Sequence, residues 1–207
     1  MRNTHEPLVF IVSGPSGSGK STLVKKLLEL PGMMLSISAT TRAPRPTEHE
    51  GEWYNFVSPR KFQQMVEADE FLEHACVFGK YNYGTPHRWV DEARAKRYDL
   101  VLEIDVQGAE QVKKKLPAAV AIFILPPSRQ ELEKRIRARG EDSEEEIRRR
   151  LDRARQEMEK YSDYDYVVVN NDIARAGREV QAIATAARSR SADNERRIRE
   201  ILDTFGG

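Results

Sequence analysis

Cysteine is almost absent from this chain, since Cys76 is the single cysteine among 207 residues. One cysteine excludes an intramolecular disulfide and a cysteine-based zinc site, and it suits a reducing compartment. The simplest interpretation of Cys76 is therefore a buried, small apolar residue.

Long hydrophobic runs and an excess of charge are lacking as well. The apolar run at 8–13 is far shorter than the roughly 20 residues of a membrane span, and a glycine-rich turn follows it instead of a cleavage site. The 34 basic and 33 acidic residues nearly cancel, so no overall field favours nucleic acid or an anionic membrane surface. We expect a cytoplasmic protein without nucleic-acid or membrane partners, either a monomer or a homo-oligomer, whose anion sites are local.

Apolar runs alternate with segments of helical spacing along the chain. Runs typical of buried strands occupy 8–13, 34–38, 99–105, 120–125 and 166–169. Helical patterns occupy 21–30, 86–97, two stretches within 128–160 joined near 140–143, and a polar stretch from 175. The order predicts an α/β fold with a parallel sheet flanked by helices, of the P-loop NTPase type, and the different character of 40–85 indicates an inserted lobe.

The segment GPSGSGKS follows the first predicted strand and matches G-x-x-x-x-G-K-[ST] at Gly14, Gly19, Lys20 and Ser21. Its glycines allow consecutive N–H groups to face phosphate oxygens at a helix N-terminus. Lys20 adds a positive charge for the outer phosphates, and the Ser21 hydroxyl suits Mg²⁺. A turn without function is disfavoured, because a lysine at a helix N-terminus needs an anion beside it. The predicted triphosphate site comprises Gly14, Pro15, Ser16, Gly17, Ser18, Gly19, Lys20, Ser21 and Thr22.

The motif alone fits a GTPase, an ATPase or a small-molecule kinase, so the next segment matters. SISATTRAPRP places Ser38, Arg42 and Arg45 after the second strand, where strand ends face the binding crevice of an open α/β sheet. Two guanidinium groups beside prolines suggest a preset anion fork. A basic surface loop is the alternative, and Tyr54 and Tyr83 fit a core position as well as a site.

Several ordered motifs together resemble the guanylate kinases over nearly the whole chain. They are GPSGSGKST, SATTRAPRP, GEWYNFVS, FLEHACVFGKYNYGTP, LEIDVQG, ILPPS, KRIRARG, EEEIRRRL and DYDYVVVNND. The resemblance implies an enzyme that transfers the γ-phosphoryl group of ATP to GMP with Mg²⁺, giving GDP and ADP in purine nucleotide metabolism. It also implies a core at 6–39, 86–127 and 161–207, a GMP-binding lobe at about 40–85 and a lid at about 128–160.

The resemblance assigns the GMP site residue by residue. Arg42, Arg45, Tyr54 and Tyr83 match residues that grip the phosphate, and Ser38, Glu73, Thr85 and Asp105 match those around guanine. The chemistry agrees for Glu73, because a carboxylate accepts from N1–H and the 2-amino group of guanine but repels the unprotonated N1 of adenine. Hydroxyls at Ser38 and Thr85 can donate to O6.

Asp105 shares strand parity with Glu103, which predicts that both acids project to one face. It could contact the guanine amine or orient Mg²⁺ through water. The resemblance favours the first role, and both stay open.

The many charges of KRIRARGEDSEEEIRRRL mostly fit pairs between residues one helical turn apart. The resemblance places Arg135, Arg139 and Arg150 over the phosphates, with Gly140 as a hinge. Together with Lys20 and Arg42 they form the predicted catalytic set. No general base is needed, because a GMP phosphate oxygen is already an anion, and the four histidines need no catalytic role.

Three features depart from the usual family pattern: Thr47 replaces a glycine, Trp53 replaces an acid, and Pro-His-Arg at 86–88 replaces a small-residue turn. They leave the fine shape of the GMP lobe open. A scaffold domain without activity would have a degraded phosphate loop, and here Lys20 and Ser21 are intact. A GTPase switch would need Asn-Lys-x-Asp, which NNDI at 170–173 does not supply.

Overall fold

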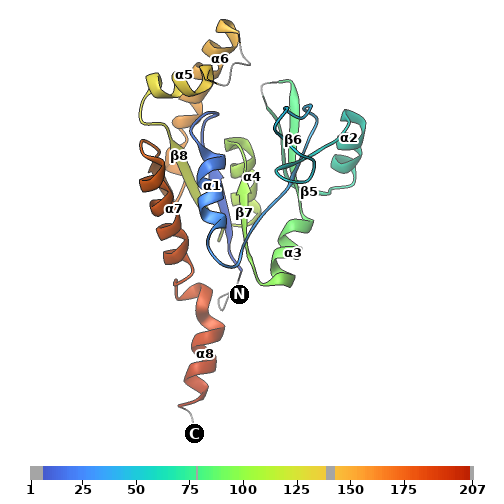
Figure 1. Cartoon of the computed structure of the whole chain (residues 1–207). Helices are drawn as coiled ribbons and strands as arrows, with labels where there is room; N and C mark the ends of the chain where they lie inside the picture. The colour runs from blue at the N-terminus through green and yellow to red at the C-terminus, as the bar shows by residue number, and fades with distance from the viewer. Residues whose placement is uncertain (1–6, 78, 139–142, 206–207) are drawn as a thin grey trace.

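The computed structural model describes residues 7–77, 79–138 and 143–205. A five-stranded parallel sheet lies between helices, and a separate four-stranded sheet stands beside it (Figure 1). The first sheet has the order β2-β7-β1-β8-β9. Its strands are β1 (Val9–Ser13), β2 (Met33–Leu35), β7 (Asp99–Glu103), β8 (Val120–Leu125) and β9 (Tyr166–Val169). The predicted α/β class is confirmed.

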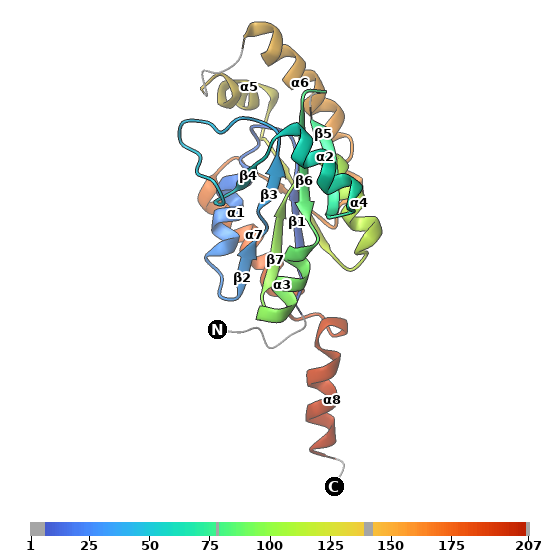
Figure 2. The same cartoon turned by 90° about the vertical axis from the view of Figure 1, so that its right-hand side faces the viewer.

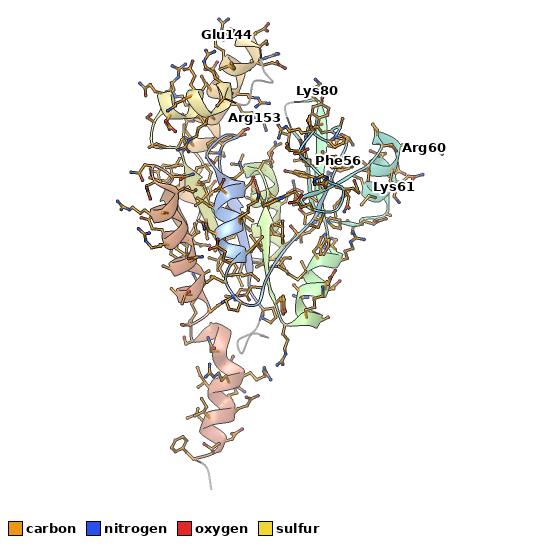
Figure 3. The ribbon with its side chains drawn as sticks, in the orientation of Figure 1. Phe56, Arg60, Lys61, Lys80, Glu144 and Arg153 are labelled. Carbon is orange, nitrogen blue, oxygen red and sulfur yellow. The ribbon has the colours of Figure 1, made fainter. Side chains whose placement is uncertain are left out.

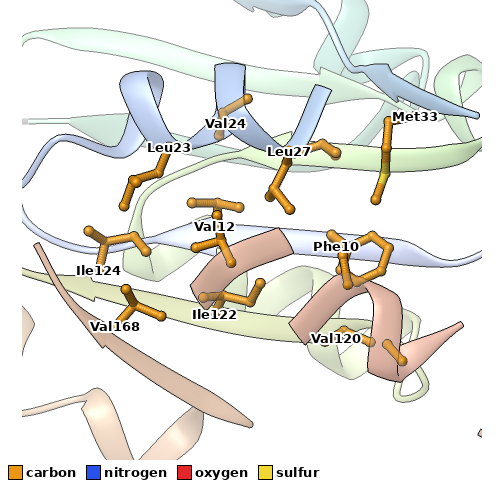
Figure 4. Close-up of a cluster of buried hydrophobic side chains, with 14 of the residues drawn as sticks. Phe10, Val12, Leu23, Val24, Leu27, Met33, Val120, Ile122, Ile124 and Val168 are labelled. Carbon is orange, nitrogen blue, oxygen red and sulfur yellow. The ribbon is translucent and has the colours of Figure 1, made fainter. Parts of the chain in front are cut away.

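Strand β1 is buried on both faces, and its alternating side chains enter two different cores. Phe10 and Val12 join one cluster with α1 (Lys20–Leu28) and α7 (Ile173–Ala187), which is drawn in Figure 4. Ile11 joins the other cluster, with α3 (Arg88–Lys96) and α4 (Val106–Lys115). A continuous apolar run is what such a strand needs.

The strand order reverses at β1, with β7 on one side and β8 on the other. In open α/β sheets the ligand crevice lies outside the carboxyl ends of the strands at such a reversal. The glycine loop at 14–19 leaves β1 at this point and continues into α1. Sheet topology therefore places the predicted phosphate site at the crevice.

The second sheet has the order β4-β3-β6-β5 and mixes parallel and antiparallel pairs. Its strands are β3 (Ser38–Thr40), β4 (Tyr54–Phe56), β5 (Phe71–Val77) and β6 (Tyr81–Pro86). Helix α2 (Pro59–Glu67) is capped by Ser58 and packs on this second sheet. Phe62, Met65 and Phe71 form a small core that is separate from the main one.

Helices α5 (Arg129–Arg137) and α6 (Glu144–Met158) lie above the crevice in both Figure 1 and Figure 2. Ser143 and Glu146 form the predicted capping box at the start of α6. The two helices share a second small core, which contains Leu132, Ile136, Ile147, Leu151 and Ala154.

Two short turns of 3-10 helix lie in the last part of the chain, one at Tyr161–Asp163 before β9 and one at Ala192–Asn194 after α7. Helix α8 (Glu195–Asp203) follows the second turn. In both views α8 extends away from the rest of the molecule. None of the helices in the described ranges is both long and apolar enough to cross a membrane.

Several sequence predictions need correction. The strand expected at 34–38 is divided, because β2 ends at Leu35 and Ser38 begins β3 in the other sheet. Helix α4 was not predicted. The strand at 166–169 was expected to be buried, but only Val168 of β9 is, since β9 is an edge strand. The polar helix expected from 175 is divided into α7 and α8, and α7 has buried apolar residues.

Cys76 also differs from its prediction, because its side chain is exposed. It alternates along β5 with the buried Ala75, so it points away from the core of the second sheet. A single cysteine in an exposed strand position adds nothing to that core.

Asp99 connects three parts of the main unit and is fully buried. It accepts hydrogen bonds from the Leu8 amide (2.8 Å) and from Nε of Arg188 (2.7 Å), just after α7. Arg188→Leu leaves this carboxylate without its guanidinium, so we expect the free energy of unfolding to fall by about 3 kcal/mol. Urea denaturation measures this change. Arg175→Leu, which breaks an exposed pair with Glu179, is the control and should change stability only slightly.

Candidate active site

A cavity of about 480 Å³ lies between the phosphate loop and the second sheet. Most of the residues predicted for the site line it. They are Gly14, Ser16, Gly17, Gly19, Lys20, Ser21, Thr22, Ser38, Arg42, Arg45, Tyr54, Glu73, Tyr83, Asp105 and Arg150. Pro15, Ser18, Thr85 and Arg135 are not in its wall, and Arg139 and the proposed hinge Gly140 lie outside the described residues.

The phosphate loop adopts backbone conformations that require glycine. Gly14 has φ 137° and Gly19 has φ 95°, and a side chain at Gly14 would overlap with the carbonyl oxygen of Ile124. Nζ of Lys20 donates to the carbonyl oxygens of Gly14 (2.8 Å) and Pro15 (3.1 Å). These two bonds hold the ammonium group against the loop.

Asn170, which the sequence analysis did not assign to the site, supports this loop from the end of β9. Its side-chain amide donates to the Ser18 carbonyl at 2.8 Å, and only 4% of the residue is exposed. A side chain at Gly19 would overlap with this amide. Arg135 donates to the carbonyl oxygens of both Ser18 (3.3 Å) and Asn170 (3.0 Å). Arg135 thus lies behind the loop in this structure and connects α5 to it.

Two oxygen ligands suited to Mg²⁺ meet at the carboxyl end of the sheet. The Ser21 hydroxyl donates to Oε1 of Glu103 at 2.7 Å, and both residues line the cavity. Mg²⁺ accepts hydroxyl and carboxylate oxygens while it keeps several waters. No group of three or more His, Cys, Asp or Glu side chains within the described ranges is arranged to hold a metal.

Arg42 forms a fork on the opposite wall, and Glu48 occupies it. The guanidinium donates twice to the Glu48 carboxylate, both at 2.8 Å, and Nε donates to the Tyr83 hydroxyl at 3.1 Å. Arg45 lies 3.7 Å from the same carboxylate. The fork expected from the sequence exists, but Glu48 was not expected in it. A carboxylate can take the place of a phosphate here, because both anions present a pair of oxygens to a guanidinium.

Tyr54 and Tyr83 meet edge to face at 5.7 Å between ring centroids, and Arg42 lies over the Tyr54 ring. Both tyrosines line the cavity. Both residues are half-buried and belong to the wall that carries Arg42.

Ser38, Thr85 and Glu73 form a buried hydrogen-bonded chain on the second sheet. The Thr85 hydroxyl donates to Oε1 of Glu73 at 2.6 Å, and the Ser38 and Thr85 hydroxyl oxygens are 3.0 Å apart. Since Thr85 has one hydroxyl hydrogen, Ser38 donates to Thr85. Glu73 is only 3% exposed, so its carboxylate is not a solvated surface group. Burial raises the pKa of Glu73 to about 7, although the Thr85 hydrogen bond opposes the shift.

Asp105 lies beyond the end of β7, so the parity argument for it was wrong in its premise. Its carboxylate caps α4 by accepting from the Gly108 amide at 2.9 Å. Even so, Glu103 and Asp105 both line the cavity. The capping role accounts for one carboxylate oxygen, and the other lies 3.7 Å from Nη2 of Arg153 on α6.

Arg153 and Glu157 were not predicted as site residues. Nε of Arg153 donates to Glu157 at 2.8 Å, and Glu157 lines the cavity. Burial raises the pKa of Glu157, while the hydrogen bond with Arg153 opposes this. Figure 3 shows Arg153 near the core, whereas Glu144 lies at the outer end of α6. The charged segment KRIRARGEDSEEEIRRRL ends at Leu151, so Arg153 lay outside the pattern from which lid arginines were predicted.

The departures from the family pattern at Thr47 and Trp53 are located at the cavity, since both residues line it. Nζ of Lys25 lies 5.6 Å from the centroid of the Trp53 ring. Trp53 also packs against the main core. An aromatic side chain thus connects the segment before β4 to α1, where an acid would not pack in this way.

The phosphate loop lies where the strand order of a parallel sheet reverses, and it faces a second wall that carries the Arg42 fork across one cavity. This combination defines a P-loop nucleotide kinase. The guanylate kinase family model matches residues 6–187. The chain belongs to the guanylate kinase family, as the sequence motifs suggested.

Individual relatives support this assignment. The chain is 46% identical over 200 residues to a guanylate kinase of Photobacterium profundum, covering 95% of this chain and 96% of that protein. It is 52% identical over 191 residues to one of Koribacter versatilis, covering 90% and 82%. A crystal structure of guanylate kinase from Anaplasma phagocytophilum superposes with a TM-score of 0.77 at 33% identity, covering 92% and 91%.

The raised pKa of Glu73 makes stability depend on pH. A glutamate in the unfolded chain titrates near 4.5 and Glu73 in the folded protein near 7, so the folded state holds the proton more tightly. Stability should therefore fall as pH rises from about 4.5 to about 7, by up to about 3 kcal/mol. Glu73→Gln removes this contribution.

The test is denaturant unfolding of both proteins at pH 5 and pH 8 without nucleotide. We expect the stability of Glu73→Gln relative to wild type to be higher at pH 8 than at pH 5. The same difference between the two proteins at both values would show that Glu73 does not titrate in this range.

Proposed function

We propose that this chain transfers the γ-phosphoryl group of ATP to GMP through one shared cavity, giving ADP and GDP. The observation that carries the proposal is that the phosphate loop, Ser38 and Glu73 face the same space. Thr85 lies behind the wall and connects Ser38 to Glu73 through hydrogen bonds. One wall suits a triphosphate and the other suits a purine with an N1–H. Membership of the guanylate kinase family supports the same reaction.

The donor nucleotide would lie on the phosphate loop. Backbone N–H groups at the start of α1 bind its phosphates, and Lys20 exchanges the carbonyl oxygens of Gly14 and Pro15 for the outer phosphate oxygens. Mg²⁺ would be held by Ser21, with Glu103 nearby, and would supply positive charge beside the phosphates. Asn170 keeps the Ser18 carbonyl turned away from the phosphates, which leaves amide groups facing them.

The acceptor phosphate would bind at the arginine fork. Arg42, Arg45, Tyr54 and Tyr83 supply guanidinium and hydroxyl donors, and Glu48 holds Arg42 in position before the substrate arrives. The GMP phosphate either displaces Glu48 or binds at the remaining N–H groups of the fork. In both cases the guanidinium planes are already oriented.

Guanine would be recognised by Glu73, Ser38, Thr85 and Asp105. Glu73 in its ionised form accepts from N1–H and the 2-amino group, which favours loss of its proton when GMP binds. The hydroxyl hydrogens of Ser38 and Thr85 point along the buried chain before binding, so the hydroxyls rotate to donate to O6. Asp105 already caps α4, and we assign its second oxygen to the guanine amine.

We assign the part of the chain from 40 to 85 to a GMP-binding lobe and the part from 128 to 160 to a lid. Arg135, Arg139 and Arg150, with Lys20 and Arg42, would neutralise the phosphoryl group during transfer. Arg135 must then leave the carbonyl oxygens of Ser18 and Asn170. Since the attacking phosphate oxygen is an anion, positioning and charge stabilisation suffice without a general base.

A panel of nucleoside monophosphates at saturating ATP tests the assignment. We expect turnover with GMP and little with AMP, CMP or UMP in a coupled assay of ADP release. Glu73→Gln keeps one acceptor oxygen and replaces the other by an NH2 donor, which would face a guanine donor. The kcat/KM for GMP should therefore fall by roughly 100-fold or more, while the KM for ATP changes little. Equal rates with AMP would exclude the guanine assignment, and unchanged selectivity in the variant would remove Glu73 from base recognition.

Gly108 offers a second test that leaves every polar group in place. It lies in α4 without a positive φ, and a Cβ there would overlap with Oε2 of Glu73. Gly108→Ala should push the carboxylate aside and raise the KM for GMP about tenfold or more, with the KM for ATP unchanged. The matched control is Gly177→Ala on α7, where the added methyl meets only the flexible Lys26 side chain. If both variants have the same KM for GMP, the close approach of Gly108 to Glu73 has no role in binding.

A further inference from the structure

Strand β5, which carries Glu73, is an edge strand of the second sheet, and helix α4 of the main unit packs against it. In an antiparallel pair, alternate residues direct both backbone groups away from the partner strand. Gln111 of α4 binds both of these groups at His74. Its Nε2 donates to the His74 carbonyl oxygen at 2.9 Å, and its Oε1 accepts from the His74 amide at 3.2 Å. One side chain therefore takes the place of a neighbouring strand beside Glu73.

The direction of the Glu73 side chain depends on how β5 is held at this point. The pairing of β5 with β6 shifts register between Phe71 and Glu73, and residues 71, 72 and 73 are all buried although a regular strand alternates its faces. Leu72 enters a core cluster of the main unit, whereas Phe71 enters the small core of the second sheet. Such an irregularity re-aims the side chains beside it, so the aim of Glu73 into the cavity depends on this register.

Helix α4 contacts β5 at three successive turns. Gly108 comes so close that a Cβ there would overlap with Oε2 of Glu73. One turn further along, Gln111 binds the backbone of the next residue in β5. After another turn, Nζ of Lys115 donates to the Phe71 carbonyl oxygen at 3.4 Å. Among these three contacts, only that of Gln111 has hydrogen bonds in both directions, so it resists sliding of β5 along the helix.

We propose that Gln111 is a positioning residue for base selection, an inference that rests on the assignment of guanine recognition to Glu73. By holding the backbone beside Glu73, the Gln111 amide keeps the carboxylate where N1–H and the 2-amino group of guanine would meet it. Gln111 is not in the wall of the cavity, so it acts through Glu73. Misplacement of a binding group by about 1 Å through a distant substitution can cost about 100-fold in rate.

A purely structural role for Gln111 would have different effects. Gln111 is half-buried, and its hydrogen bonds join neutral groups, so their loss should change the stability of the fold only modestly. A general loosening of the molecule would alter the binding of both nucleotides. The positioning role is confined to GMP and depends on the Glu73 carboxylate.

Steady-state kinetics of Gln111→Met tests the proposal. Methionine has a similar length and helix propensity but no amide to bind the His74 backbone. We expect the KM for GMP to rise about tenfold, with the KM for ATP unchanged. Lys114→Met is the matched control, because it places the same side chain on the same helix and breaks only an exposed pair with Glu110. It should have the kinetic constants of the wild type.

Gln111→Glu provides a second variant of nearly the same shape. It keeps an acceptor for the His74 amide but sets a carboxylate against the His74 carbonyl oxygen, so it should impair GMP binding at least as much as Gln111→Met. An unchanged KM for ATP shows that each variant folds.

A double-mutant cycle shows whether Gln111 acts through Glu73. In the Glu73→Gln background, Gln111→Met should lower kcat/KM for GMP by about threefold at most, because the carboxylate that Gln111 positions is already gone. The same tenfold loss in both backgrounds would overturn the proposal. A wild-type KM for GMP in Gln111→Met, or equal rises in KM for GMP and ATP, would overturn it as well. All three results leave GMP turnover by the wild type intact, whereas a wild-type chain without that turnover would refute the proposed function and this inference together.

Discussion

The whole arrangement serves one electrostatic constraint, which is that two phosphate groups, both anions, must come into contact in a single cavity. The two walls meet this constraint differently. On the loop side, backbone amides and a helix N-terminus supply partial charges that are fixed in place by the strand order around β1. On the other side, full charges on Arg42 and Arg45 are held in place by Glu48. A net charge of +1 for the chain hides this local concentration of positive groups.

Burial sets the chemistry of the residues that we propose for base recognition. Ser38, Thr85 and Glu73 are almost inaccessible to solvent and are paired with one another. In such a place an unsatisfied polar group is costly, so under our proposal a base with the wrong pattern of donors would be rejected by what it leaves unpaired. The same burial raises the pKa of Glu73 into the physiological range, so the proposed selectivity and the proton binding would have one physical origin.

Local signals in the sequence predicted the parts of the fold that depend on local physics. The apolar runs of β1, β8 and β9 and the capping box of Ser143 and Glu146 gave correct positions for strands and for the start of α6. Helix α4 was missed because VQGAEQVKKK has few apolar residues to reveal its period. The division between β2 and β3 was missed because the sheet that a strand joins is set by partners far away in the sequence.

Within the site, motif residues such as Lys20 could be named because their chemistry is specific to phosphate. Glu48 and Asn170 could not, since an acid in a charged loop and an asparagine after a strand have many uses.

The separate clusters of apolar residues have a further consequence. The second sheet and the pair α5 and α6 each have a small core of their own, and the main unit has two. Leu72 of β5 belongs to one of the main clusters and Trp53 packs against the other. Apolar contacts therefore already join the second sheet to the main unit, whereas the cavity between them stays open. Purine rings and phosphates bound between the two walls would fill this cavity, so the substrates would be structural components of the closed enzyme.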